Sequence, residues 1–145
     1  MLWLADTNIL LRLAASSGPD YDPVRRAVQT LLARGDRLCY TPQNLVEFWN
    51  VATRPADRNG FGLSPAETDT RARLIESAFL LLPDSEAVHA EWRRLVIRHA
   101  VIGVQVHDAR LAASMVVHGI RNLLTLNGRD FARYPGIVVV SPASV

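Results

Sequence analysis

The stretch LWLADTN, residues 2–8, decides the fold of this 145-residue chain. Residues 2–5 form an apolar run that ends at Asp6. A short apolar segment followed by small polar residues predicts a buried strand that leads into a turn or a helix start. Similar apolar runs predict strands within RLCYT at 37–41, around 79–82, within NLLTLN at 122–127 and within GIVVVS at 136–141.

Helical patterns lie between these runs. In residues 22–35, Asp22 is the expected N-cap, Pro23 the first helical residue and Gly35 the residue after the helix end. Thr41 followed by proline predicts the start of a helix that continues to about residue 54. Ser64 and an acidic residue three positions later predict a capped helix. Two more amphipathic helices are expected, over 84–100 and over 107–118.

Strands rich in Leu and Val that alternate with helices predict an α/β domain. Its central sheet is expected to be mainly parallel and covered by helices on both faces. The chain is 49% hydrophobic and 21% charged and contains no linker or repeat, so residues 1–145 are interpreted as a single domain. The first apolar run is too short for a signal peptide or a membrane span, and a cytoplasmic protein is therefore expected.

The residue types that are missing exclude several classes of site. All 16 basic residues are arginines, which excludes a Walker A lysine, a Schiff-base lysine and a Ser-Lys dyad. Cys39 is the only cysteine, so no internal disulfide can form, and we interpret it as a core residue. The four histidines lack partners at zinc-ligand spacing. The net charge of +2 is compatible with an anionic partner such as RNA.

Four acidic residues stand out by their positions. Asp6 follows the first strand and Asp130 comes soon after the strand in 122–125, so both belong at the carboxyl edge of the sheet, where α/β proteins place their sites. Glu47 lies in the almost wholly apolar stretch NLVEFWNVA. Asp108 shares a helical face with Leu111, Ala112 and Met115, which is unfavourable for an uncompensated carboxylate.

Each of these residues has a purely structural interpretation when taken alone. Asp6 could form an Asx-turn, Asp108 could cap its helix, Glu47 could pair with an arginine, and Asp130 could cap the next turn. Four converging carboxylates would repel one another, however, and a divalent cation is the usual compensation. Oxygen-only ligation favours Mg²⁺ or Mn²⁺, one ion or two, and such a site can hydrolyse a phosphodiester.

Several segments together resemble the PIN-domain ribonucleases, particularly the VapC-like toxins of toxin-antitoxin pairs. They are LADTNILLRL from residue 4 onward, NLVEFWNVATR around Glu47, HDARLAA from residue 107, LLTLNGRDF from residue 123, and PGIVVVSP near the end. The segments follow the family's order and approximate spacing over nearly the whole chain. The resemblance implies a PIN-like α/β/α sandwich that cleaves RNA with Mg²⁺ or Mn²⁺ and leaves 5′-phosphate and 3′-hydroxyl ends.

The resemblance also assigns roles to individual residues. Asp6, Glu47 and Asp108 become the three principal acidic positions, and Asp130 becomes the fourth. Four supporting residues would hold the carboxylates and waters in place: Thr7, Asn8, Thr125 and Asn127. Many family members carry an acid where this chain has Asn127, so a second metal site here is expected to be weaker.

The family further implies a homodimer and an antitoxin whose basic or aromatic side chains enter the acidic pocket. RNA contacts are expected from the loop 54–65 and from Arg25 and Arg26. A non-catalytic PIN-like module that binds RNA or an antitoxin is the alternative. An aspartyl-phosphate phosphatase is a more distant one, because DTN lacks a second acid and the chain has no lysine.

Overall fold

The computed structural model describes residues 1–15 and 17–145. In these residues five strands form one sheet in the order β3-β2-β1-β4-β5, and every neighbouring pair is parallel. The strands are β1 (Leu2–Ala5), β2 (Arg37–Tyr40), β3 (Leu80–Leu81), β4 (Asn122–Leu124) and β5 (Val138–Val140). This arrangement confirms the predicted α/β class and the parallel sheet.

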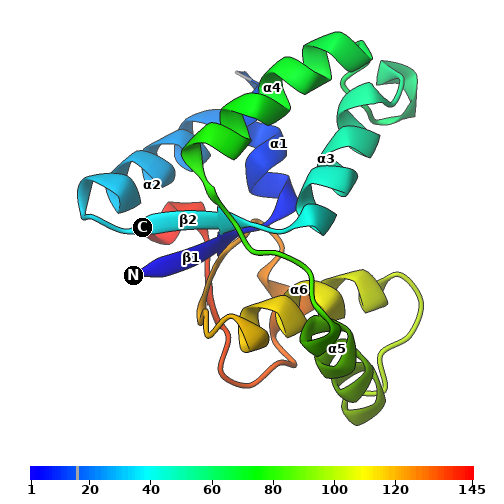
Figure 1. Ribbon diagram of the computed structural model, residues 1–145. Coiled ribbons are helices and arrows are strands. Elements are labelled where there is room, and N and C mark those ends of the chain that lie inside the picture. The colour runs from blue at the N-terminus through cyan, green and yellow to red at the C-terminus, as the bar shows by residue number, and fades with distance from the viewer. Residues whose placement is uncertain (16) are drawn as a thin grey trace.

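Helices cover both faces of the sheet, as Figure 1 shows. The helices on one face are α1 (Thr7–Ala15), α2 (Tyr21–Ala33), α3 (Pro42–Thr53) and α4 (Pro65–Ala78). On the other face lie α5 (Glu86–Arg98) and α6 (Gln105–Val117). Each layer has its own hydrophobic core, and β1 contributes to both, because Trp3 and Ala5 pack into one core and Leu4 into the other. The expected α/β/α sandwich is therefore confirmed.

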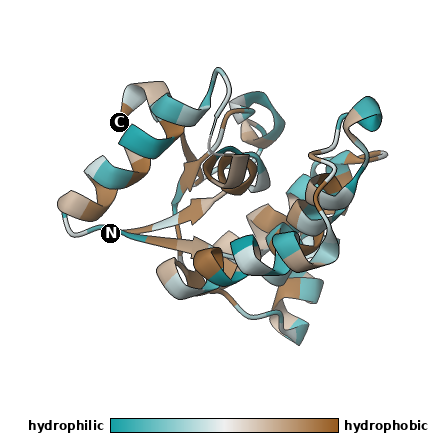
Figure 2. Ribbon diagram, turned by 90° about the horizontal axis from the view of Figure 1, so that it is seen from above, coloured by the Kyte–Doolittle hydropathy of each residue, from teal (hydrophilic) through white to brown (hydrophobic). Residues whose placement is uncertain are grey.

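The hydropathy pattern explains why the strands read as continuous apolar runs. Figure 2 shows hydrophobic residues along the central strands and hydrophilic residues on much of the helical surface. A strand with helices on both faces has no solvated side, so its residues do not alternate with polar ones. Cys39 is fully buried in β2, which confirms its interpretation as a core residue. None of the helices in the described ranges is both long and apolar enough to cross a bilayer.

The predicted N-cap of α2 is wrong by two residues. The helix begins at Tyr21 with Asp20 as its N-cap, not at Pro23 with Asp22. The backbone N–H of Val24 donates to the carbonyl of Asp20 at 3.1 Å, so the first turn closes before the expected start. Proline is accepted at the third helical position because the first turn leaves its N–H groups without intrahelical partners.

Helix α6 begins two residues earlier than expected, at Gln105 instead of residue 107. Asp108 is therefore the fourth residue of the helix and still lies in its first turn, where the helix dipole favours a negative charge. The last helical residue is Val117, close to the predicted end at 118, and Gly119 follows with φ +68°.

The loop from Arg54 to Ser64 is more structured than the sequence suggests. It contains a short 3-10 helix, Ala56–Arg58, and backbone hydrogen bonds from residues 60–63 return to Pro55, α3 and the helix's C-cap residue Arg54. Gly60 packs against the backbone of Arg54 so closely that a Cβ would lie 1.9 Å from the Arg54 carbonyl oxygen. A residue with a side chain cannot take this position without moving the backbone.

Replacing Ser64 by alanine is expected to lower the melting temperature by about 3 °C, equivalent to about 1 kcal/mol. Ser64 accepts from the backbone N–H of Glu67 at 3.1 Å, and the Glu67 carboxylate accepts from the Ser64 N–H at 2.8 Å. Alanine removes the first of these bonds at the start of α4. Thermal melts followed by circular dichroism measure the change. Ser77→Ala, at the other end of the same helix, should leave the melting temperature within about 1 °C.

The strand order reverses at β1, and the crevice expected at such a reversal, the β1–β4 crevice, lies at the carboxyl ends of these two strands. The chain passes from β1 to β2, which pairs with one edge of β1, whereas β4 pairs with the opposite edge of β1. At such a reversal the connections leave in opposite directions and open a space at the carboxyl ends of the two strands. The residues that follow β1 and β4, Asp6 and Thr125, therefore lie at the point where an α/β protein places its site.

Candidate active site

Asp6 lies at the centre of this edge and is only 7% exposed. One carboxylate oxygen, Oδ1, accepts from the backbone N–H of Thr7 at 2.7 Å. The other, Oδ2, accepts from the hydroxyl of Thr125 at 2.5 Å and from the side-chain amide of Asn8 at 3.0 Å. Because three groups from two segments converge on it, the Asp6 side chain is held in one orientation.

Burial raises the pKa of Asp6 above its ordinary value, and the negative charge of Glu47 raises it further. The hydrogen bonds from Thr125, Thr7 and Asn8 act in the opposite direction because they stabilise the ionised form. Burial and the charge of Glu47 together outweigh these hydrogen bonds. The protein therefore holds at this edge a carboxylate whose charge is incompletely compensated by its own hydrogen bonds.

Glu47 reaches the same edge from α3. Its Oε2 accepts from the hydroxyl of Thr7 at 2.7 Å, and its Oε1 accepts from the side-chain amide of Gln43 at 2.7 Å. Thr7 thus links the two acidic residues, because its backbone N–H binds Asp6 while its hydroxyl binds Glu47. Glu47 has no arginine partner among the ion pairs of the described residues, so the alternative interpretation as a salt-bridge residue is not supported.

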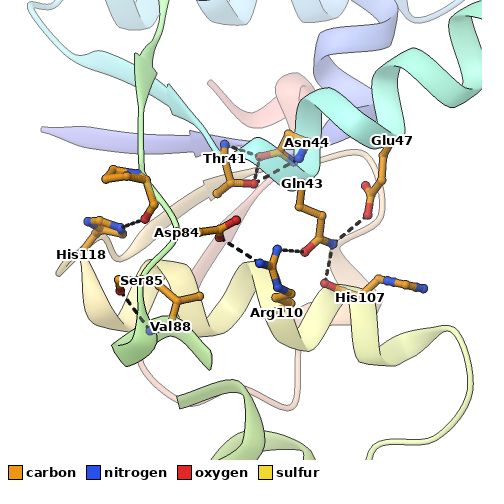
Figure 3. Close-up of polar contacts among 11 residues, drawn as sticks. Thr41, Gln43, Asn44, Glu47, Asp84, Ser85, Val88, His107, Arg110 and His118 are labelled. Carbon is orange, nitrogen blue, oxygen red and sulfur yellow. Dashed lines mark hydrogen bonds and ion pairs between the residues drawn. The ribbon is translucent and has the colours of Figure 1, made fainter. Parts of the chain in front are cut away.

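Asn44 is a site residue that the sequence interpretation missed. It is fully buried, its Oδ1 accepts from the backbone N–H and the hydroxyl of Thr41, and its Nδ2 donates to the hydroxyl of Thr7 at 3.0 Å. The cap of α3 and the orientation of Thr7 therefore depend on the same amide (Figure 3 shows the Thr41–Asn44 pair). The spacing of Thr41 and Asn44, which is that of a capping box, is the signal that could have identified it.

Asp108, on α6, and Asp130, in the segment after β4, complete the acidic group. Partial burial of Asp108, together with the negative charges of Asp130, Asp6 and Glu47, raises its pKa to about 7. The guanidinium of Arg133 opposes this shift. Each of the other three carboxylates thus lies near enough to disfavour the charged form of Asp108. The structure brings together all four acidic residues singled out in the sequence.

The four supporting residues are not equivalent. Thr7, Asn8 and Thr125 hydrogen bond to the acidic residues or to one another, and the Oδ1 of Asn8 also accepts from the backbone N–H of Leu126 at 3.2 Å. Asn127 is exposed, and within the described ranges only its backbone contacts the group: its N–H donates to the Thr125 hydroxyl at 3.0 Å, and its carbonyl accepts from the Asp130 N–H at 3.2 Å. Its side chain forms no hydrogen bond there.

The donor set suits a hard divalent cation. The acidic group offers oxygen atoms only, as Mg²⁺ and Mn²⁺ prefer. In residues 1–15 and 17–145 no three His, Cys, Asp or Glu side chains approach closely enough to hold one ion together. Mg²⁺ in proteins is usually held by one or two carboxylates and several waters, so direct ligation by three side chains is not required. The residues therefore fit a hydrated ion.

The two segments expected to contact RNA lie on the α1–α4 face of the sheet. Arg25 and Arg26 belong to α2, and Arg26 is exposed. The loop at 54–64 follows the end of α3, a helix about 18 Å long in which Glu47 lies half-way along. Figure 1 shows this loop at the end of α3 that points away from α6.

Comparisons with known proteins agree with this geometry. The chain matches the model of the PIN domain family over residues 4–137. No match was found among curated proteins. Three similar solved structures are VapBC2 from Rickettsia felis bound to a DNA fragment from its promoter (15% identity, TM-score 0.72, 97% of this chain and 98% of that one), a toxin-antitoxin complex from Klebsiella pneumoniae (24%, 0.66, 98% and 98%), and VapC20 from Mycobacterium tuberculosis, a Sarcin-Ricin loop cleaving toxin (17%, 0.68, 93% and 98%).

The family model covers most of the segments in which the sequence resemblance was found, from Leu4 in β1 to the residue before β5. The structural similarities extend over nearly the full length of this chain and of each compared chain. Both the model match and the fold agree with the predicted identity of the domain. The chain belongs to the PIN domain family.

Proposed function

We propose that this protein is a metal-dependent endoribonuclease that acts as the toxin of a toxin-antitoxin pair. The observation that carries the proposal is the convergence of Asp6, Glu47, Asp108 and Asp130 at the β1–β4 crevice, with the pKa of Asp108 raised to about 7. A group of carboxylates that disfavour one another's charge gains stability when a cation binds. Membership of the PIN domain family supports the same activity.

In this proposal the acidic residues hold Mg²⁺ or Mn²⁺. When bound, the ion supplies Lewis-acid chemistry that activates a water molecule and neutralises charge developing on the phosphodiester. Asp6, Glu47 and Asp108 would be the principal residues that hold the ion, one or two of them directly and the rest through its waters, and Asp130 would contribute from η2 (Gly128–Phe131). Thr7, Asn8 and Thr125 keep the carboxylates of Asp6 and Glu47 in a fixed orientation.

The number of ions depends on the residues that follow β4. Asn127 offers a neutral amide there, so a second ion would rely on Asp130, directly or through water. We therefore propose one firmly held ion and a weaker second site. Asn127 takes part through its backbone and through any water its exposed amide holds.

The proposed partners follow from the acidic group and from the compared structures. One of these is a toxin-antitoxin complex and another is a toxin that cleaves the Sarcin-Ricin loop. An antitoxin arginine would form charge-assisted hydrogen bonds with the carboxylates and so compete with the metal ion. We propose a homodimer, with RNA phosphates contacted by Arg25, Arg26 and the loop 54–65.

A non-catalytic binding module is the second candidate function. It is favoured by one observation: no three potential ligands in the described part of the chain are close enough to hold an ion directly. In this case the acidic group would bind a basic segment of a partner protein and would not turn over RNA.

The test is cleavage of an end-labelled total RNA pool by the purified protein in Mg²⁺, in Mn²⁺ and in EDTA, followed by mapping of the product ends. We expect cuts with 5′-phosphates and 3′-hydroxyls in either metal and none in EDTA. An Asp6→Asn preparation purified in parallel controls for contaminating nucleases. Equal background cleavage by both proteins, with Mn²⁺ binding still detected, would favour the binding module.

A further inference from the structure

A line of polar contacts joins three separate elements next to the acidic group. Asp84, in the segment after β3, pairs with the guanidinium of Arg110 on α6 at 3.0 Å. Arg110 donates to Oε1 of Gln43 on α3 at 3.2 Å, and Nε2 of Gln43 donates to Oε1 of Glu47 at 2.7 Å. Figure 3 shows Gln43 at the centre of this line, between Arg110 and Glu47.

Gln43 also contacts the backbone of α6. Its Nε2 donates a second hydrogen bond to the carbonyl oxygen of His107 at 2.9 Å. His107 directly precedes Asp108 in the sequence. One amide nitrogen therefore ties the carboxylate of Glu47 to the turn of α6 that carries Asp108, although the two helices lie on opposite faces of the sheet.

The orientation of the Gln43 amide is determined by its neighbours. Its nitrogen faces two acceptors, the Glu47 carboxylate and the His107 carbonyl, and its oxygen faces a donor, the Arg110 guanidinium. A rotated amide would place its oxygen against a carboxylate and its nitrogen against a cation, so all three contacts would be lost. Arg110 thus selects the orientation in which Gln43 can bind Glu47.

The ion pair between Arg110 and Asp84 is partly exposed, so its effect on the position of Gln43 can be tested separately from any effect on stability. The side chains of Arg110 and Asp84 are 38% and 42% exposed. Solvent-exposed ion pairs contribute little to the free energy of unfolding. Removing one of these two residues should therefore leave the fold intact. The position of Glu47, in contrast, depends on the contacts from Asp84 through Arg110 and Gln43.

We propose that Gln43 is a positioning residue that sets the Glu47 carboxylate relative to Asp108, and that Arg110, held by Asp84, fixes the amide of Gln43. The inference rests on the proposed function, because it takes Glu47 and Asp108 to hold the same ion. It adds Gln43, Arg110 and Asp84 to the residues on which the site depends.

The first experiment is a Mn²⁺ titration of the metal-free protein by calorimetry, together with kcat and KM for RNA cleavage and the melting temperature in EDTA. Gln43→Ala is expected to weaken Mn²⁺ binding about tenfold and to lower kcat by a similar factor, because groups that orient metal ligands typically have effects of this size. KM should change less than twofold, since Gln43 is not expected to contact the RNA. Arg73→Ala, which removes an exposed ion pair with Asp69 on α4, is the matched control and should change none of these values.

Two further variants test whether Arg110 acts on Glu47 through Gln43. Arg110→Ala should weaken Mn²⁺ binding in the same direction as Gln43→Ala, and Arg110→Lys, which keeps a cationic donor, should recover part of the loss. If Arg110 acts through Gln43, the double variant should be no worse than Gln43→Ala alone. Additive losses would overturn the assignment of Arg110.

The outcomes distinguish this inference from the proposed function. A wild-type protein that binds Mn²⁺ but cleaves no RNA overturns the nuclease proposal, and the inference then stands or falls on whether Gln43→Ala weakens Mn²⁺ binding. Wild-type Mn²⁺ affinity and kcat in Gln43→Ala would overturn the inference while leaving the nuclease intact. A wild-type protein that binds no Mn²⁺ would overturn both.

Discussion

Replacing Asp6 by asparagine is expected to reduce metal-dependent RNA cleavage by about a thousandfold, equivalent to about 4 kcal/mol of transition-state stabilisation. Asparagine has the size of the natural residue, and its oxygen can still accept from the Thr7 N–H. Its amide lacks the negative charge that holds a cation at the β1–β4 crevice. The measurement is the cleavage rate of one mapped RNA substrate at saturating Mg²⁺.

The same variant should remain folded. Burial raises the pKa of Asp6, so removing its charge relieves an unfavourable state in the metal-free protein. Against this gain, the new Nδ2 group would face the Nδ2 of Asn8, which now donates to Asp6. We expect these effects nearly to cancel, leaving the melting temperature in EDTA within a few degrees of the wild-type value.

The control for this prediction is Glu86→Gln, which removes an exposed carboxylate in the first turn of α5. It should cleave at the wild-type rate. An Asp6→Asn protein that is folded and cleaves within tenfold of wild type would contradict the assignment of Asp6 as a principal metal ligand. A matching loss in Glu86→Gln would point to a general charge effect.

The second large effect is a dependence of stability on pH in the absence of metal. The pKa of Asp108 is raised from 3.8 to about 7, chiefly by burial and then by the charges of its acidic neighbours. Between these values the folded protein keeps a proton that the unfolded chain releases. This contribution to stability is therefore complete below about pH 4 and is lost as the pH rises through 7.

The full shift corresponds to about 4 kcal/mol, and because Asp108 is only half-buried, solvent screening reduces the expected effect to about 2 kcal/mol. Urea unfolding in EDTA at pH 5.5 and pH 8 measures the part of this effect that falls between the two pH values, about 1 kcal/mol, as a lower free energy of unfolding at pH 8. Saturating Mg²⁺ should reverse the loss at pH 8, because an ion that binds only the folded state stabilises it.

Asp108→Asn provides the test of the cause. An amide at this position does not titrate, so the difference between pH 5.5 and pH 8 should shrink by about half or more, while Glu86→Gln should retain it. Equal pH dependence in wild type and Asp108→Asn would show that other groups produce the effect. Asp6 acts in the same direction, since its pKa is also raised, and it accounts for part of the remainder.

Much of the fold could be predicted because local signals and the global arrangement agree. The apolar run before Asp6 forms β1, and the capping residues Thr41 and Ser64 begin α3 and α4 as expected. The signal was weaker at α2, where both Asp20 and Asp22 precede the helical pattern. The sequence pattern favoured Asp22 as the N-cap because proline, here Pro23, is common at the first helical position. In the structure the hydrogen bond from the Val24 N–H to the Asp20 carbonyl fixes the earlier start.

The candidate site was predictable where a residue type is unusual for its surroundings. Asp6, Glu47 and Asp108 are acids in apolar stretches, and each lies in the acidic group of the folded protein. Gln43 was not predicted, because a glutamine in the first turn of a helix is unremarkable. Its spacing of four residues from Glu47 is the only local signal. Its contact with Arg110 joins positions 67 residues apart, which sequence periodicity cannot indicate.

The distribution of the site along the chain has a consequence for synthesis. Strand β1, made first, has as one of its two sheet neighbours β4, which is made last but one, and the Thr125 hydroxyl that orients Asp6 follows β4. Contacts over such long separations form late in folding. A chain emerging from the ribosome therefore lacks the assembled acidic edge until β4 and Thr125 have been translated and have docked. Under the proposed function the chain gains its harmful activity only then, so an inhibitor that is already present can bind it as soon as it folds.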